Sequence, residues 1–148
     1  MMPSMIVRTE VLGQPARQLQ LRPQPGQAVV WFPHWNSRRP VPVSDGAHLG
    51  GLIGQVSQGD YGGVELERTR GGPWAQVKCL GKGRFLVELH PHVYHGPDDG
   101  MYFERVNGVS AVTAGALCWA WVRREPLPAD IALEPRVVPP GGIRDVPL

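Results

Sequence analysis

The side chains best suited to chemistry are concentrated in HPHVYHGPDDG, residues 90–100. Imidazole nitrogens and carboxylate oxygens are the ligands that zinc and similar metal ions accept. The candidate metal ligands in this segment are His90, His92 and His95. Its spacing matches neither HExxH nor a cysteine-based zinc pattern, which favours a solvated loop or a surface that contacts a partner. The residues that we expect to make this contact are His92, Tyr94, His95, Asp98 and Asp99.

A second segment, PHWNSRRP at residues 33–40, places a tryptophan beside two arginines. An exposed Trp flanked by Arg is typical of a protein-interface hot spot. The same indole could stack on a nucleotide base, or it could fold back over the edge of the core. We expect Trp35, Arg38 and Arg39 to form one contact surface with the loop at residues 90–100.

No motif in the chain identifies a reaction. Its serines lie in no GxSxG elbow, and its glycine-rich turns lack the GxxxxGK[ST] pattern of a phosphate loop. Glu65, Glu67 and Glu88 could in principle be paired catalytic carboxylates, but their alternation with apolar residues favours the solvated face of a sheet. The sequence therefore predicts a non-enzymatic protein without a cofactor.

Length and composition narrow the class of protein further. The 148 residues suit one domain, and 42% hydrophobic with 19% charged residues is typical of a folded chain. A net charge of +2 is too small to favour a nucleic acid partner. No secretion signal is evident, and no apolar run approaches the ~18 residues that cross a bilayer, so we expect a cytoplasmic protein that does not enter a membrane.

Residues 61–106 alternate between apolar and polar side chains in four runs that are separated by glycine-bearing turns. Alternation with a period of two is typical of an antiparallel sheet with one buried face. The compact run AVVWF predicts a further, buried strand before them. The predicted strands are 5–11, 28–32, 61–68, 74–79, 84–90 and 101–106.

A short helix is predicted over residues 45–58. Its N-cap is expected at Ser44 or Asp45, and its apolar stripe consists of Leu49, Leu52, Ile53 and Val56. Three glycines weaken this helix, and we expect them to permit its close approach to a sheet. These are Gly50, Gly51 and Gly54.

A second helix is predicted over residues 111–124, after an N-cap at Ser110. Its apolar residues almost encircle it, which indicates burial on more than one side. We expect Trp31, Trp119 and Trp121 to lie in the core.

The predicted fold is α+β: one antiparallel sheet of about five or six strands packs against the buried C-terminal helix, with the short helix beside it. Residues 1–125 are expected to form a single domain, followed by a proline-rich tail at residues 126–148, either disordered or laid across the body. Cys79 and Cys118 lie in no metal-binding spacing, so we interpret them as small buried hydrophobic residues.

The order of segments YGGVELER, GGPWAQVKC, GRFLVELH, MYFERV and VSAVTAGALCWAWVRREPLP resembles the small α+β immunity proteins of bacterial polymorphic-toxin systems, over about residues 61–128. The resemblance implies a protein that binds a cognate toxin and blocks it by surface occlusion. Immunity proteins that face nuclease toxins are commonly acidic, whereas this chain is slightly basic. The implied partner is then another class of toxin, or the acidic residues gather locally at Glu65, Glu67, Glu88, Asp98 and Asp99.

Two other functions stay open from the sequence. The protein could be a structural or accessory component of a larger assembly such as a phage particle, with residues 12–27 and 126–148 as arms that wrap its neighbours. Alternatively it could be a small metal-binding protein or enzyme that uses the histidines of residues 90–95.

Overall fold

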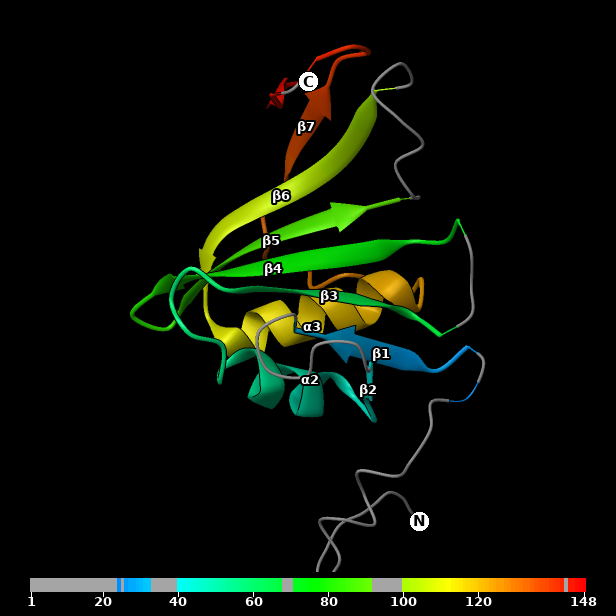
Figure 1. The fold of residues 1–148 in the computed structure, drawn as a ribbon, viewed down its shortest axis with the longest axis vertical. Coiled ribbons are helices and arrows are strands. Elements are labelled where there is room, and N and C mark those ends of the chain that lie inside the picture. Colours follow the sequence, from blue (N-terminus) through cyan, green and yellow to red (C-terminus); the bar gives the residue numbers. More distant parts are fainter. Residues whose placement is uncertain (1–23, 25, 33–39, 68–70, 92–99, 143) are drawn as a thin grey trace, which may run out of the picture.

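A computed structural model describes residues 24, 26–32, 40–67, 71–91, 100–142 and 144–148. Within these residues, one eight-stranded antiparallel sheet carries two helices on one face (Figure 1). The elements are β1 (Ala28–Trp31), β2 (Val41–Pro42), α2 (Gly46–Ile53), β3 (Tyr61–Leu66), β4 (Trp74–Gly81), β5 (Arg84–His90), β6 (Met101–Val109), α3 (Ala111–Val122), β7 (Glu134–Val138) and β8 (Val146–Pro147). The α+β class is confirmed, and the sheet has more strands than the five or six predicted.

The strands are ordered β2-β1-β3-β4-β5-β6-β7-β8, and every neighbouring pair is antiparallel. Strand β1 and the meander from β3 to β6 are the predicted part, and the predicted strand at residues 5–11 lies outside the described residues. The additional strands are β2, β7 and β8. Each contains a proline, and for that reason the sequence did not predict a strand there. Proline is tolerated at sheet edges, because the missing N–H can face away from the ladder. In the described residues, the strand at each edge of the sheet is two residues long and ends in a proline, Pro42 in β2 and Pro147 in β8.

The core lies between the sheet and the helices. Alternate strand residues point inward and are at most 1% exposed, among them Val30, Val64, Val77, Val87 and Leu89. Helix α3 packs against β3, β4 and β5, and α2 packs against α3. The hydroxyl of Ser110 accepts a hydrogen bond from the N–H of Thr113, so the predicted N-cap of α3 is confirmed.

The two helices cross at glycines. An added Cβ at Gly115 of α3 would lie 2.5 Å from the backbone nitrogen of Gly50 and 2.7 Å from the carbonyl oxygen of Gly46. The expectation that the glycines of α2 approach a sheet was therefore wrong, because Gly50 approaches the other helix. A stripe of hydrophobic residues cannot show whether a sheet or a helix will cover it.

Helix α2 ends at Ile53, five residues before the predicted end at residue 58. Asp45 is its N-cap and accepts a hydrogen bond from the N–H of His48. After Gly54 the chain turns through short bonds, in which the N–H of Gln55 donates to Leu52 and that of Val56 donates to Ile53. This turn keeps Val56 buried, so the apolar stripe extends past the helix itself.

The segment after α3 returns to the sheet, where β7 pairs with β6 at the end away from the helices (Figure 1). Four charged side chains join these strands. The Arg136 guanidinium lies 2.7 Å from Asp145 and 2.8 Å from Glu134, and the Arg105 guanidinium lies 3.2 Å from Asp145. Since Arg105 belongs to β6, these ion pairs attach the C-terminal hairpin to the body of the sheet.

Acid should loosen the C-terminal hairpin before the core. The hydrogen bond from Arg136 holds the pKa of Asp145 below its ordinary value. A carboxylate whose folded pKa is lowered stabilises the fold at pH values above its unfolded pKa of about 3.9, and this stabilisation is lost as the pH falls through the folded pKa. Amide exchange in β7, corrected for intrinsic rates, should therefore accelerate between about pH 4 and pH 2 more than exchange in β5. Asp145→Asn should weaken this acid response, and an unchanged response would contradict the assignment.

Candidate functional site

Most of the predicted contact residues lie outside the described part of the chain, and they stay predictions. These are Trp35, Arg38, Arg39, His92, Tyr94, His95, Asp98 and Asp99. His90 is the one candidate metal ligand that the structure describes. Among the described residues, no three His, Cys, Asp or Glu side chains are grouped closely enough to hold a metal ion.

His90 ends β5 and is 1% exposed. Its ring is stacked between Trp74 of β4, at a centroid distance of 4.0 Å, and Phe103 of β6, at 4.8 Å. Its Nε2 lies 3.4 Å from a carboxylate oxygen of Glu88, and its Nδ1 is buried without a hydrogen-bond partner in the described structure. Both ring faces are covered, so His90 acts in the fold as the central ring of an aromatic row across three strands.

Trp121, near the end of α3, is hydrogen-bonded to the backbone of two residues of this row. Its indole N–H lies 3.1 Å from the carbonyl oxygen of Trp74 and 3.0 Å from that of His90, and it donates to both. These two residues are the first of β4 and the last of β5, paired across the ladder. Trp121 therefore fixes the point at which the chain leaves the sheet for residues 91–100.

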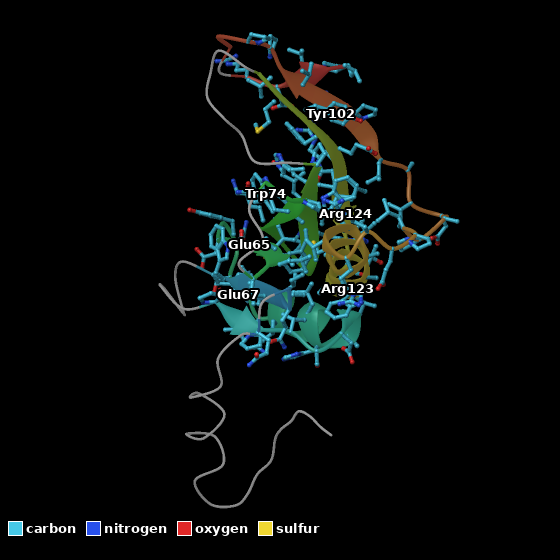
Figure 2. All side chains as sticks on the ribbon, turned by 90° about the vertical axis from the view of Figure 1, so that its right-hand side faces the viewer. Glu65, Glu67, Trp74, Tyr102, Arg123 and Arg124 are labelled. Atoms are coloured by element: carbon cyan, nitrogen blue, oxygen red, sulfur yellow. The ribbon has the colours of Figure 1, made fainter. Side chains whose placement is uncertain are left out.

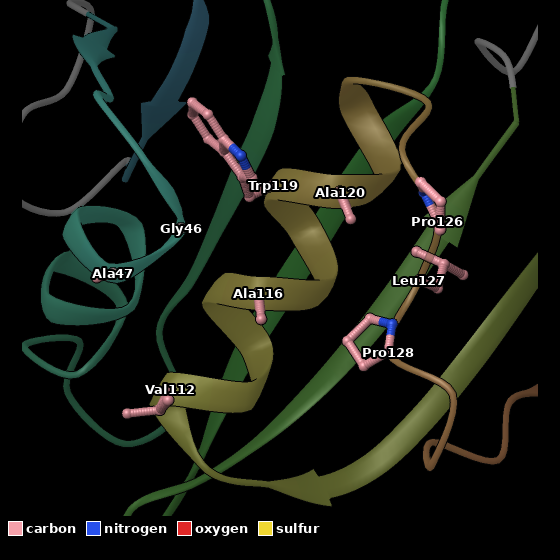
Figure 3. Close-up of a pocket in the computed structure, with 9 residues that line it drawn as sticks. All are labelled: Gly46, Ala47, Val112, Ala116, Trp119, Ala120, Pro126, Leu127 and Pro128. Atoms are coloured by element: carbon pink, nitrogen blue, oxygen red, sulfur yellow. The ribbon is translucent and has the colours of Figure 1, made fainter.

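Helix α3 has one side that neither the sheet nor α2 covers. An open groove of about 440 Å³ runs along it, here called the α3 groove (Figure 3). Its lining residues are Gly46, Ala47, Val112, Ala116, Trp119, Ala120, Pro126, Leu127 and Pro128. The side chain of Val112 is 78% exposed, and the Arg123 guanidinium lies over the ring of Trp119 at 4.8 Å. The groove is thus almost entirely apolar, with a cation beside its largest aromatic ring.

A second groove of about 330 Å³, here called the Trp121 groove, lies around the C-terminal end of α3. Its lining residues are Pro73, Pro91, Trp121, Arg124, Glu125 and Leu127. Leu127 lines both grooves, so they adjoin. Pro91 directly follows His90, and the Trp121 groove therefore borders the base of the predicted contact loop.

Of the three tryptophans expected in the core, Trp119 and Trp121 pack against it, although all three are partly exposed. Trp119 and Trp121 line the grooves. Trp31 lies on the opposite face of the sheet, where an added Cβ at its cross-strand partner Gly63 would meet its ring at 2.3 Å. An indole has enough surface to cover a core edge and still present one side to solvent.

The sheet face away from the helices carries the predicted row of carboxylates. Glu65 is exposed there, and desolvation by surrounding protein, followed by the charge of Glu67, raises its pKa above the ordinary value. Figure 2 shows Glu65, Glu67 and Trp74 on the side of the sheet away from Arg123. Glu65 lies on β3 and Glu88 on β5, with β4 between them, so these two strands are about 10 Å apart. Glu65 and Glu88 therefore do not form a carboxylate pair of the kind used in acid–base catalysis.

Both cysteines are buried, as predicted. Complete burial raises the pKa of the Cys118 thiol to about 12, which keeps it protonated and unreactive at neutral pH.

Sequence reasoning missed the α3 groove. Its signal was present, since Val112, Ala116, Trp119 and Ala120 recur at helical spacing on one side of α3. The whole helix is apolar, however, so this stripe did not differ from the two stripes that are covered.

Comparison of the chain with family models, with curated proteins and with solved structures finds no match. None of the helices in the described residues has the length and apolar character needed to cross a membrane.

Proposed function

We propose that this protein is a non-enzymatic binding protein that recognises a protein partner through the surface of α3 formed by the two adjoining grooves. The observation that carries the proposal is the open side of α3. Val112, which is 78% exposed, lies there on the same stripe as Trp119, and the Arg123 guanidinium stacks on the ring of Trp119. Exposed aromatic and aliphatic groups beside Arg have the composition of interface centres.

The sheet edges support recognition through a face. In the part of the chain that the structure describes, each edge strand is two residues long and contains a proline, so neither offers a row of free N–H and C=O groups to an incoming strand. A partner that binds this protein would therefore use side-chain packing, for which α3 offers the apolar surface.

The specific form that we propose is neutralisation of a cognate toxin in the cytoplasm, by occlusion of the toxin surface and without a cofactor. The resemblance of residues 61–128 to immunity proteins supports this form, and so does a candidate surface suited to packing. The assembly alternative used residues 126–148 as an arm. In the structure β7 and β8, which lie in this segment, join the protein's own sheet, which disfavours that alternative.

The α3 groove can be tested with Val112→Glu. Because Val112 is largely exposed, this change should leave the thermal unfolding temperature nearly unchanged, but it would place a carboxylate in the apolar contact. We expect affinity for a toxin domain encoded beside the gene to fall about 30-fold or more, as for a hot-spot residue. Binding is measured by calorimetry, and protection is measured as growth of cells that express both proteins.

Leu80→Glu is the matched control, since Leu80 is 40% exposed on β4 and lines neither groove. It should protect cells as well as the wild type does. If Val112→Glu also protects fully, the α3 groove is not the contact surface. If the wild-type protein neither binds nor protects, the toxin-neutralising form of the proposal is wrong.

A further inference from the structure

Arg124 occupies a backbone position that favours glycine. Its φ is +58°, in the left-handed region, directly after the end of α3. The turn is closed by backbone groups: the N–H of Arg124 donates to the carbonyl of Trp121 at 3.1 Å, and the N–H of Glu125 donates to that of Ala120 at 2.9 Å. This is a Schellman motif, in which glycine is the usual residue at the position of Arg124. The turn does not need the arginine side chain, and that side chain adds steric strain.

The guanidinium of Arg124 has no hydrogen-bond or ion-pair partner within the described residues, and the residue is exposed. Its neighbour Arg123 differs, because the guanidinium of Arg123 stacks on Trp119 and pairs with Glu125 at 2.9 Å. Arg123 therefore already neutralises the nearest carboxylate, and it already supplies a cation at the negative end of the helix. One positive charge, that of Arg124, is left at the rim of the Trp121 groove.

Resting on the proposed function, we infer that Arg124 binds a carboxylate of the protein partner, while apolar side chains of the same partner segment fill the α3 groove. A guanidinium presents a planar fork that matches a carboxylate with two parallel hydrogen bonds. The grooves adjoin at Leu127, so one short segment can reach both. The partner segment is therefore apolar and carries Asp or Glu at the end that lies beside Arg124. This contact explains a strained arginine that has no partner among the described residues, and the described fold gives no other reason for it.

The test uses random 12-residue peptides displayed on phage and selected on the full chain. We expect the selected peptides to combine apolar residues with an Asp or Glu at a constant position. A synthetic peptide of this kind should bind Arg124→Gly about tenfold or more weakly than the wild type. The same peptide with its acidic residue changed to the amide should bind the wild type just as weakly, and Arg124→Gly should not distinguish the two peptides.

Two controls accompany the measurement. Arg124→Gly should raise the thermal unfolding temperature, because glycine relieves the positive φ, so weaker binding cannot be attributed to a damaged fold. Arg144→Gly removes another exposed arginine that lines neither groove, and it should bind both peptides as the wild type does.

The outcomes separate the inference from the proposed function. Selection of no peptide, or of peptides without an acidic residue, overturns the inference, as does equal binding by Arg124→Gly. If Val112→Glu abolishes peptide binding while Arg124→Gly leaves it unchanged, the α3 groove binds partners and the role of Arg124 alone is wrong. If Val112→Glu has no effect on peptide binding, the proposed surface fails as well.

Discussion

Replacing Gly115 by alanine should destabilise the fold by about 3 kcal/mol. The added Cβ would lie 2.5 Å from the backbone nitrogen of Gly50 and 2.6 Å from its Cα, whereas carbon atoms in contact are ordinarily about 3.5–4.0 Å apart. Backbone atoms cannot rotate away as a side-chain terminus can, so α2 must move off α3 and disturb the core beneath it. Urea unfolding, followed by tryptophan fluorescence, measures the loss.

The glycines of α2 provide the controls. At Gly51 an added Cβ would meet nothing within 4 Å, so Gly51→Ala should stabilise the protein by up to about 1 kcal/mol through helix propensity. At Gly50 it would meet the carbonyl oxygen of Ala111 at 3.2 Å, and the effect of Gly50→Ala should lie between the other two. If all three variants have the same free energy of unfolding, the close contact between α2 and α3 does not exist.

The part of the fold that the sequence predicted is the part made by local patterns. Strands β3 to β6 follow one another along the chain, and their inward residues alternate with a period of two. The cap at Ser110 is local too, since its partner Thr113 is three residues away. Each of these features can be recognised in a window of about ten residues, because neighbouring groups decide it.

The strands that sequence reasoning missed depend on distant residues. Strand β7 pairs with β6 across the whole of α3, and the contact between Arg105 and Asp145 spans 40 positions in the chain. Prolines also mark β2, β7 and β8 as poor strands on local grounds. The pairing of β7 with β6 and the contact between Arg105 and Asp145 outweigh this local preference, and no short window contains these two interactions.

The candidate site illustrates the same limit. The spacing of His90 from His92 and His95 predicts a possible metal ligand. In the structure, however, Trp74 and Phe103 stack on the two faces of its ring, and both come from other strands. The α3 groove could not be distinguished in advance, because a helix that is apolar all round does not indicate which side its neighbours leave open. On local grounds an arginine at position 124 indicates only a cation suited to the C-terminal end of a helix, because its positive φ is a property of the folded turn.

Replacing Trp121 should destabilise the protein. We expect a loss of about 3 kcal/mol for Trp121→Ala and of about 2 kcal/mol for Trp121→Phe. The alanine variant loses packing between α3 and the ends of β4 and β5. The phenylalanine variant keeps most of that packing but leaves the carbonyl oxygens of Trp74 and His90 without the indole donor. Urea unfolding gives both values, and the difference between them separates packing from hydrogen bonding.

Trp119→Phe is the control for Trp121→Phe, because the indole N–H of Trp119 has no acceptor among the described residues. This change should lower the free energy of unfolding by less than about 1 kcal/mol, because Arg123 makes a weaker contact with the smaller ring. Trp121→Phe should also accelerate amide exchange at the start of β4 and the end of β5, while exchange in β3 stays the same. Equal costs for the two Trp→Phe changes would mean that the bonds from Trp121 do not hold the strand ends. The point at which the chain leaves the sheet beside the Trp121 groove would then be fixed by the β4–β5 ladder alone.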